Sequence, residues 1–154
     1  MLVQIAAAAR LLVSATCSAE KHDLVKSMGA SDVFDYHKTS MDDLSHEYDI
    51  VIDCVGGKTL RQCFDLVKPG GRLVTLPAAL TAEEKALRSD IYANFFIVEP
   101  DGEQLSQIAQ LCESGAVKPV LRAVLPLDEG AKAFEMLAEG HSAGKIVLKV
   151  TQKE

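Results

Sequence analysis

The chain has 154 residues, of which 48% are hydrophobic and 25% charged, and its formal net charge is −6. This composition excludes a disordered chain, a collagen and a coiled coil, and the length fits one globular unit. The acidic balance and the scattered basic residues also exclude the basic face of a nucleic-acid binder and the cationic patch of a protein held at anionic membranes.

The first 17 residues are mostly apolar, but they do not have the pattern of a secretory signal. Arg10 interrupts the apolar stretch, whereas a signal peptide carries its positive charge before that stretch. The stretch is also shorter than the ~20 apolar residues that span a bilayer. We expect a cytoplasmic protein, with a mitochondrial presequence as the open alternative. Residues 2–9 predict the end of a helix and 11–17 a strand, an order that indicates a missing upstream element.

The rest of the chain alternates predicted strands and helices. Strands alternating with helices of ~10 residues predict βαβ units, right-handed crossovers and a mostly parallel sheet. We therefore expect an α/β fold with a doubly wound, mostly parallel sheet. The further predicted strands span residues 32–36, 49–54, 72–76, 92–98, 120–125 and 146–150, and the predicted helices span 19–28, 58–67, 81–89, 102–114 and a segment that begins at 128.

Some residues are expected to begin or end these elements or to face the core. Ser18 is a candidate N-cap and Gly29 a left-handed C′ residue, while Thr81 and Glu84 have the spacing of a capping box. Because its residues are apolar and β-branched, the strand 49–54 is expected to be buried on both faces. Among the helix residues that we expect to face inward are Leu60, Phe64, Val67, Leu105, Ile108, Leu111, Cys112, Ala131, Phe134 and Leu137.

Candidate site residues lie just after each strand, because open α/β sheets bind ligands at the carboxyl ends of their strands. A dinucleotide-binding fold that selects NAD carries Asp or Glu at the position that Ser18 occupies here. A small hydroxyl leaves room for a 2′-phosphate, which Lys21 would neutralise from the first turn of the following helix. Tyr36 ends the neighbouring strand and would flank the same phosphate or the adenine. The alternative is that Ser18 only caps a helix and that Lys21 is solvated.

The sequence contains neither a G-x-G-x-x-G loop nor a P-loop, and no catalytic residue can be assigned. The glycine pairs at 56–57 and 70–71 are expected to form turns. No nucleophile matches the four histidines, which we expect at the surface: His22, His37, His46 and His141. No C-x-x-C pair or zinc-finger spacing occurs, so we expect no metal site and four free thiols: Cys17, Cys54, Cys63 and Cys112.

Five segments, taken in order, resemble the medium-chain dehydrogenase/reductase superfamily, and more narrowly its zinc-independent quinone oxidoreductase branch. They are ATCSAEKHDLVKSMGASDVFDY (15–36), YDIVIDCVGG (48–57), LVKPGGRLVTL (66–76), FFIVEPDGEQL (95–105) and GHSAGKIVLKV (140–150). The resemblance covers essentially the whole chain. It implies a Rossmann-like domain that binds NADP (NADPH), in an enzyme that passes hydride to a small-molecule acceptor such as a quinone, an enone or an aldehyde.

The resemblance also implies cofactor contacts, residue by residue. It implies that the 2′-phosphate of NADP is held by Ser18, Lys21 and Tyr36. It places the adenine side at Cys54 and Val55, and the nicotinamide end at Leu76, Pro77, Phe95, Phe96 and Val98. It implies a C-terminal turn that closes over the cofactor at Gly144 and Lys145.

The chain also departs from the family pattern, because the N-terminal catalytic domain, the first Rossmann strand and its glycine loop are absent. In the 3-2-1-4-5-6 strand order the missing strand lies between strands 2 and 4, so we expect a split sheet with unpaired edges. We expect residues 1–118 to be a partial NAD(P)-binding domain and 119–154 a segment that returns to the catalytic domain. The hypothesis is a truncated or split form, or a degenerate relative. The strand 91–98 matches the edge-to-edge dimer contact of the family, so the resemblance implies a homodimer, and association with a missing N-terminal half is the alternative.

Two other functions stay open. The segment FDLVKPGGRLV (64–74) is also typical of class I methyltransferases, although no acidic G-x-G loop accompanies it. A non-catalytic Rossmann-like interaction module would explain the missing glycine loop, since a fold does not determine a function. The sequence does not identify the acceptor, because the residues that would select it are absent.

Overall fold

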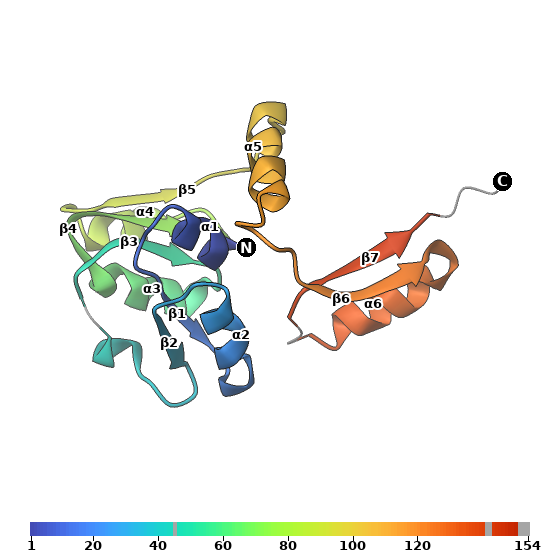
Figure 1. The fold of residues 1–154 in the computed structure, drawn as a ribbon. Helices are drawn as coiled ribbons and strands as arrows, with labels where there is room; N and C mark the ends of the chain where they lie inside the picture. The colour runs from blue at the N-terminus through green and yellow to red at the C-terminus, as the bar shows by residue number, and fades with distance from the viewer. Residues whose placement is uncertain (45, 141–142, 151–154) are drawn as a thin grey trace. The chain divides into compact units, whose positions relative to one another are not determined.

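A computed structural model describes residues 1–44, 46–140 and 143–150 (Figure 1). The chain divides into two compact units: a first unit of residues 1–33 with 102–154, and a second unit of residues 34–101. Each unit is described by itself below. Over the described residues the strands form three sheets, ordered β1-β2, β3-β4-β5 and β6-β7. No helix in this part of the chain combines the length and the apolar character needed to cross a bilayer.

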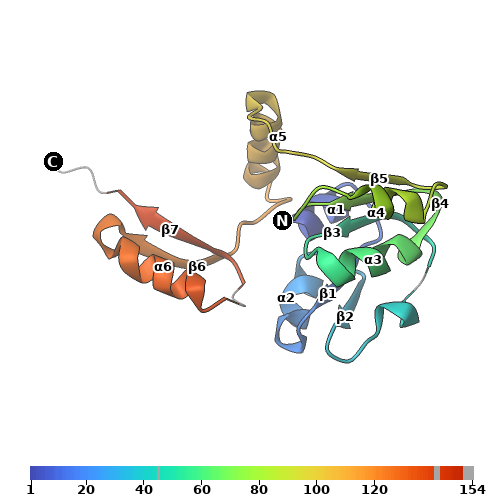
Figure 2. The ribbon, with the colours of Figure 1, turned by 180° about the vertical axis from the view of Figure 1, so that it is seen from behind.

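The second unit is built on a parallel sheet of β3 (Tyr48–Asp53), β4 (Val67–Thr75) and β5 (Tyr92–Phe95). The helix α3 (Gly57–Leu66) links the first two strands, and α4 (Ala82–Leu87) precedes the third (Figure 2). A short 3-10 turn, η2 (Met41–Asp43), precedes β3. These elements confirm the predicted alternation of strand and helix and the parallel direction of the strands.

The core of the second unit lies between α3 and one face of this sheet. Leu60 and Phe64 of α3 pack there, as the apolar spacing predicts, against Val67 and Leu73 of β4. Val67 is buried as expected, but it begins β4 instead of ending the helix. The prediction that β3 is buried on both faces was wrong, because Ile50 and Ile52 are exposed. β3 lies at the edge of its sheet, and α3 packs on the opposite face.

Arg88 stabilises the edge of this unit at which β4 begins, opposite the carboxyl ends of the strands. Its guanidinium donates to the carbonyl oxygens of Phe64 (3.2 Å) and Val67 (3.3 Å), where α3 passes into β4. The same group forms a two-pronged ion pair with Asp90. The predicted capping box of Thr81 and Glu84 at the start of α4 is confirmed, with both reciprocal hydrogen bonds present.

The N-terminal part of the first unit contains α1 (Leu2–Ala8), β1 (Ser14–Cys17), a 3-10 turn η1 (Ala19–Lys21) and α2 (His22–Ser27). β2 (Asp32–Asp35) lies at the boundary of the units and pairs with β1. The separate β1-β2 and β3-β4-β5 sheets over the described residues confirm the predicted split of the sheet. Gly29 follows α2 with φ +102°, as expected of a left-handed C′ residue.

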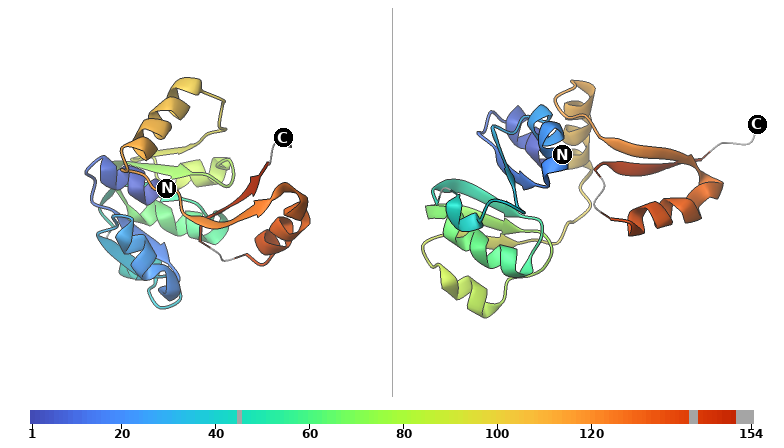
Figure 3. Two further views of the ribbon diagram at one scale, coloured as in Figure 1. Left: turned by 45° about the vertical axis from the view of Figure 1, so that its right-hand side comes forward. Right: turned by 90° about the horizontal axis from the view of Figure 1, so that it is seen from below.

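The C-terminal part of the first unit contains α5 (Gly102–Glu113), β6 (Leu121–Pro126), a 3-10 turn η3 (Leu127–Glu129), α6 (Gly130–Ala138) and β7 (Lys145–Lys149). β6 and β7 pair in parallel, and α6 packs on them (Figure 3). The inward residues of α6 were predicted wrongly: Phe134 and Leu137 are 74% and 60% exposed, whereas Ala133 is buried. Leu105 of α5 is likewise exposed. A two-stranded sheet is narrow, so it covers only the small-residue stripe of α6.

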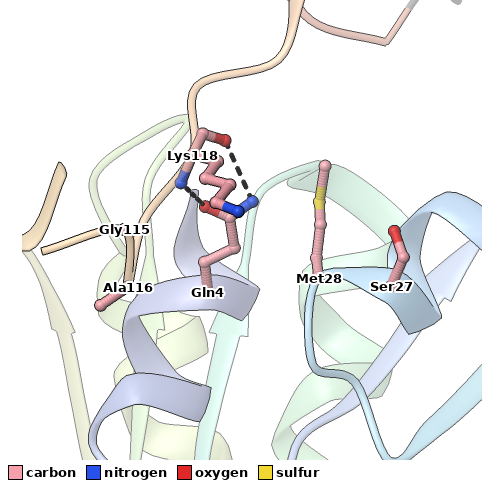
Figure 4. A pocket seen from close by; sticks show the side chains of 6 residues that line it. All are labelled: Gln4, Ser27, Met28, Gly115, Ala116 and Lys118. Atoms are coloured by element: carbon pink, nitrogen blue, oxygen red, sulfur yellow. Dashed lines mark hydrogen bonds between the residues drawn. The ribbon is translucent and has the colours of Figure 1, made fainter.

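Gln4 of α1 joins the two parts of the first unit. Its buried side-chain amide donates to the Lys118 carbonyl (3.1 Å), and its carbonyl oxygen accepts from the Lys118 amide (2.7 Å), as Figure 4 shows. Both polar ends of a buried amide are thus satisfied by one residue 114 positions away. This reciprocal pair fixes the start of α1 against the segment that enters β6.

Candidate functional site

Three strand ends lie in register at one edge of the second unit. Asp53 of β3 pairs with Thr75 of β4, and Thr75 pairs with Phe95 of β5. The residues that follow these three strands are therefore neighbours at the carboxyl edge, the position where α/β sheets bind ligands. The structure thereby brings Cys54, Val55, Leu76, Pro77 and Phe95 of the predicted site to one edge, and Phe96 and Val98 of that site follow β5 in the chain. We call them the strand-end ledge.

The turn between β3 and α3 packs closely on the end of β4. Gly56 has φ +81° and ψ −170°, a backbone conformation that only glycine adopts readily. A Cβ atom at Gly56 would lie 3.3 Å from Cβ of Pro77. This contact confirms that Gly56 serves a tight turn, and it places Val55 beside the residues that follow β4.

Asp53 organises this turn, and it was not among the site residues predicted from the sequence. The residue is 2% exposed, and its carboxylate accepts hydrogen bonds from the backbone amides of Val55 (3.0 Å) and Gly56 (3.0 Å). It also accepts from the hydroxyl of Thr75 (2.9 Å), which is completely buried. An acid that ends an apolar run just before Gly-Gly is the signal that would have pointed to Asp53.

The ledge is uncharged and exposed. Val55 is 71% exposed, and Leu76, Phe96 and Val98 are also exposed. Since the amides of Val55 and Gly56 are already bonded to Asp53, this turn does not offer them to a phosphate. The chemistry of the ledge therefore suits a planar, uncharged ring better than an anion.

Two cysteines near Asp53 differ in exposure. Cys54 lies at the surface, and desolvation raises the pKa of its thiol, with a further upward contribution from the negative charge of Asp53. Cys63 is buried in the core, and burial raises the pKa of its thiol to about 12, with smaller contributions from Asp53 and Cys54. Neither cysteine has the lowered pKa of a thiolate nucleophile.

The tip of β1, in the first unit, carries Ser18 and Lys21. The Ser18 side chain makes no capping hydrogen bond, contrary to expectation, although its carbonyl accepts from the Lys21 amide (2.9 Å). The Ser18 hydroxyl instead donates to the carboxylate of Glu20 (3.3 Å). Glu20 is exposed, whereas Ser18 and Lys21 are half-buried. An acid therefore lies within reach of the predicted phosphate position, which was not expected from the sequence.

Tyr36, the third residue predicted at the 2′-phosphate, follows β2 in the second unit. Its side chain is exposed, and its ring lies against that of His37 with centroids 4.3 Å apart. Ser18 and Lys21 belong to the first unit, so each part of this predicted group is located only within its own unit.

Gly144 and Lys145 lie at the start of β7. Gly144 has φ +98°, and a Cβ atom there would lie 2.8 Å from the carbonyl oxygen of Val120, so the position requires glycine. The Lys145 amide donates to the same carbonyl oxygen (2.8 Å). Both residues line a pocket of about 170 Å³, together with Met28, Lys118 and others.

The pockets of the first unit are small. A second one, of about 180 Å³, lies between Gln4, Ser27, Met28 and Lys118 (Figure 4). Cofactor sites usually enclose ~300–1,000 Å³, so neither pocket encloses a whole dinucleotide. The residues that fit a nicotinamide nucleotide are those of the ledge, for its rings, and Lys21, for a phosphate.

Among the described residues, no group of three or more His, Cys, Asp or Glu side chains is arranged so that it could hold a metal ion. His46 is bonded to the carbonyl oxygens of Asp65 and Asp42, which raise its pKa. His22 is half-buried, and its Nε2 atom has no hydrogen-bond partner in the described part of the chain. His141 lies outside the described residues.

Comparison with known proteins places this geometry in a family. The chain is 36% identical over 145 residues to a "probable zinc-binding oxidoreductase, mitochondrial" of Arthroderma benhamiae, covering 90% of this chain and 44% of that protein. It is 36% identical over 138 residues to an NADPH-dependent alkenal/one oxidoreductase, chloroplastic, of Arabidopsis thaliana, covering 88% and 33%. The solved quinone oxidoreductase of Coxiella burnetii superposes with a TM-score of 0.86 at 28% identity, over 97% of this chain and 48% of that one.

The chain thus spans less than half the length of these relatives. The structural match confirms the predicted Rossmann-like fold, and the covered share confirms that the resemblance concerns about half of a family member. The sequence profile of zinc-binding dehydrogenases matches residues 28–148. This match includes β2 to β6, all but the last residue of β7 and the whole strand-end ledge, and so the chain belongs to the zinc-binding dehydrogenase family.

Proposed function

We propose that the chain is the nucleotide-binding half of an NADPH-dependent oxidoreductase that reduces a quinone, an enone or a similar carbonyl acceptor. The observation that carries the choice of NADPH is the tip of β1, where Ser18 occupies the position of the acid that would select NAD, with Lys21 three residues on. The names of two relatives, an alkenal/one oxidoreductase and a quinone oxidoreductase, support the acceptor class.

In this proposal each region of the chain binds a different part of the cofactor. The Lys21 ammonium pairs with the 2′-phosphate, and the Ser18 hydroxyl turns from Glu20 to donate to it. Tyr36 flanks the phosphate, and the strand-end ledge supports the rings. Gly144 and Lys145, at the start of β7, would also contact the cofactor. When bound, the cofactor supplies the hydride, while the protein contributes position and electrostatics.

The rest of the enzyme comes from outside these residues. The relatives are more than twice as long as the matched segment, so the acceptor site is expected on an N-terminal half or on a companion chain. We propose that residues 1–118 correspond to the nucleotide-binding domain and 119–154 to the segment that returns to the catalytic part. The break falls just before β6, which pairs only with β7 over the described residues.

A homodimer is part of the same proposal. β5 lies at the edge of its sheet, and the residues that continue it, Phe96, Ile97 and Val98, are exposed and apolar. An exposed apolar edge is a template for pairing with a second copy. Light scattering should give twice the chain mass, and Ile97→Lys should return the chain mass.

We propose that the protein resides in the cytoplasm. The test is to follow the tagged protein in cells, and its import into mitochondria would overturn this proposal.

The decisive experiment for the proposed function is a thermal shift with matched cofactors. Saturating NADPH should raise the melting temperature of the purified chain by several degrees, because a ligand bound at 100 Kd adds about 2.7 kcal/mol of stability. NADH at the same concentration should have a smaller effect. No shift with either cofactor would favour a non-catalytic interaction module, the reading that the missing glycine loop supports. A shift with S-adenosylmethionine alone would favour a methyltransferase.

A further inference from the structure

The buried carboxylate at the centre of the ledge has no cation among the hydrogen-bond partners that the structure records for it. Asp53 accepts from two backbone amides, those of Val55 and Gly56, and from the Thr75 hydroxyl. Burying a carboxylate costs free energy unless its oxygens are hydrogen-bonded. All three donors belong to the turn after β3 or to the end of β4. The position of the Asp53 carboxylate is therefore better explained by the turn that it holds in place than by its negative charge.

The three bonds determine which surface of the turn faces outward. They draw the amides of Val55 and Gly56 inward, and they hold Gly56 against Pro77 at the end of the next strand. The Val55 side chain is left 71% exposed above this contact. Without the carboxylate, the two amides would be free to turn outward, and the turn would become an attractive site for an anion.

We infer that Asp53, supported by Thr75, is a positioning residue of the cofactor site, which keeps the turn after β3 as an uncharged platform for a ring of the nucleotide and excludes phosphate from it. This inference rests on the proposed function. It adds that the two regions have different roles: the tip of β1 recognises the charge of the phosphate, and the strand-end ledge binds a ring and no phosphate.

The first test replaces the carboxylate and compares two readouts. Asp53→Asn should raise the Kd for NADPH about tenfold, the effect of losing one charge-assisted hydrogen-bond system. In the absence of cofactor, the same variant should let Cys54 react faster with a thiol reagent at a fixed pH, with an apparent pKa below that of the wild type. Reaction at Cys54 is followed by mass mapping, which separates it from the buried Cys63. The matched control, Arg88→Gln, perturbs the opposite edge of the same unit and should lower the melting temperature while changing neither readout.

A second pair of variants keeps the test decisive if Asp53→Asn does not fold. Thr75→Val preserves the shape of a completely buried side chain but removes its hydroxyl, whereas Thr75→Ser keeps the hydroxyl. Thr75→Val should raise the Kd for NADPH about threefold to tenfold, and Thr75→Ser should restore values near those of the wild type.

The outcomes separate this inference from the proposed function. If the wild type binds NADPH but neither the Asp53 nor the Thr75 variants differ from Arg88→Gln in Kd or in Cys54 kinetics, the positioning role is wrong and the function stands. If the wild type does not bind NADPH at all, the proposed function and the cofactor role of Asp53 both fail.

Discussion

The strand-end ledge and the tip of β1 are built in opposite ways. The ledge is held by a buried carboxylate, a buried hydroxyl and a turn whose backbone conformation only glycine adopts readily. The tip of β1 consists of Ser18, Glu20 and Lys21, whose side chains are exposed or half-buried and bonded only locally. A backbone platform of this kind is preorganised, and it recognises shape. Flexible charged side chains at a surface recognise charge, and a single substitution can change their preference.

The largest expected effect is a loss of the preference for NADPH at the tip of β1. Lys21→Glu replaces a cation with an anion at the proposed 2′-phosphate, so the Kd for NADPH should rise about tenfold to a hundredfold, the equivalent of ~1.4–2.8 kcal/mol. The Kd for NADH should change less than about threefold, since NADH lacks that phosphate. Fluorescence titration of both cofactors measures the ratio of the Kd values for NADPH and NADH. Lys26→Glu, an exposed charge reversal on α2, is the matched control and should leave the ratio unchanged. Equal binding of NADPH to the wild type and Lys21→Glu would remove Lys21 from the site.

The next largest effect is expected from a substitution at the ledge, which should weaken the binding of NADPH and NADH alike. Gly56→Ala forces a Cβ atom to within 3.3 Å of Pro77 on a backbone with φ +81°, so unfolding should become easier by about 1–3 kcal/mol. The Kd values for NADPH and NADH should rise together, by about the same factor, because both cofactors share the rings. Gly57→Ala is the control, since its Cβ would meet nothing within 4 Å although φ is also positive. A selective loss of NADPH in Gly56→Ala would contradict the assignment of the ledge to the rings.

A smaller effect concerns the pH dependence of thiol chemistry at the ledge. Desolvation and the charge of Asp53 raise the pKa of Cys54, so less thiolate is present at neutral pH than in an unfolded chain. Alkylation of Cys54 at pH 7 should therefore be several-fold slower in the folded protein, and its rate should rise about tenfold per pH unit up to pH 9. Cys63, with a pKa raised to about 12, should stay unmodified over this range. Bound NADPH should protect Cys54, and alkylation of Cys54 at the rate of the unfolded chain would show that the turn is not held as described.

The same contrast explains which features the sequence could predict. The apolar runs predict the strands of the second unit and their parallel direction, and the spacing of Thr81 and Glu84 predicts a capping box, because these are local patterns. The local pattern could mark Asp53 as an acid at the end of an apolar run, but it could not identify Thr75 as its partner, since Thr75 lies 22 residues away and faces it only through the register of β3 and β4. The exposure of Phe134 was missed for a related reason: helical spacing identifies an apolar stripe, but it does not say how wide a sheet will cover it.

The smallest effect should come from Glu20, and it tests how freely the tip of β1 adapts. Its carboxylate accepts from the Ser18 hydroxyl at 3.3 Å, so it competes for the group that would donate to a 2′-phosphate and repels that phosphate. Glu20→Gln removes the repulsion and keeps the shape, so the Kd for NADPH should fall about twofold to fivefold, within the range measured for exposed charge pairs. The gain should shrink between low salt and 0.5 M salt, because exposed charges are screened over a few ångströms at high ionic strength. NADH binding should not change, and Asp23→Asn on α2 supplies the matched removal of a nearby exposed charge. If Glu20→Gln weakens NADPH binding instead, the carboxylate orients Ser18 rather than competing with the phosphate, and the tip of β1 is more organised than its exposure suggests.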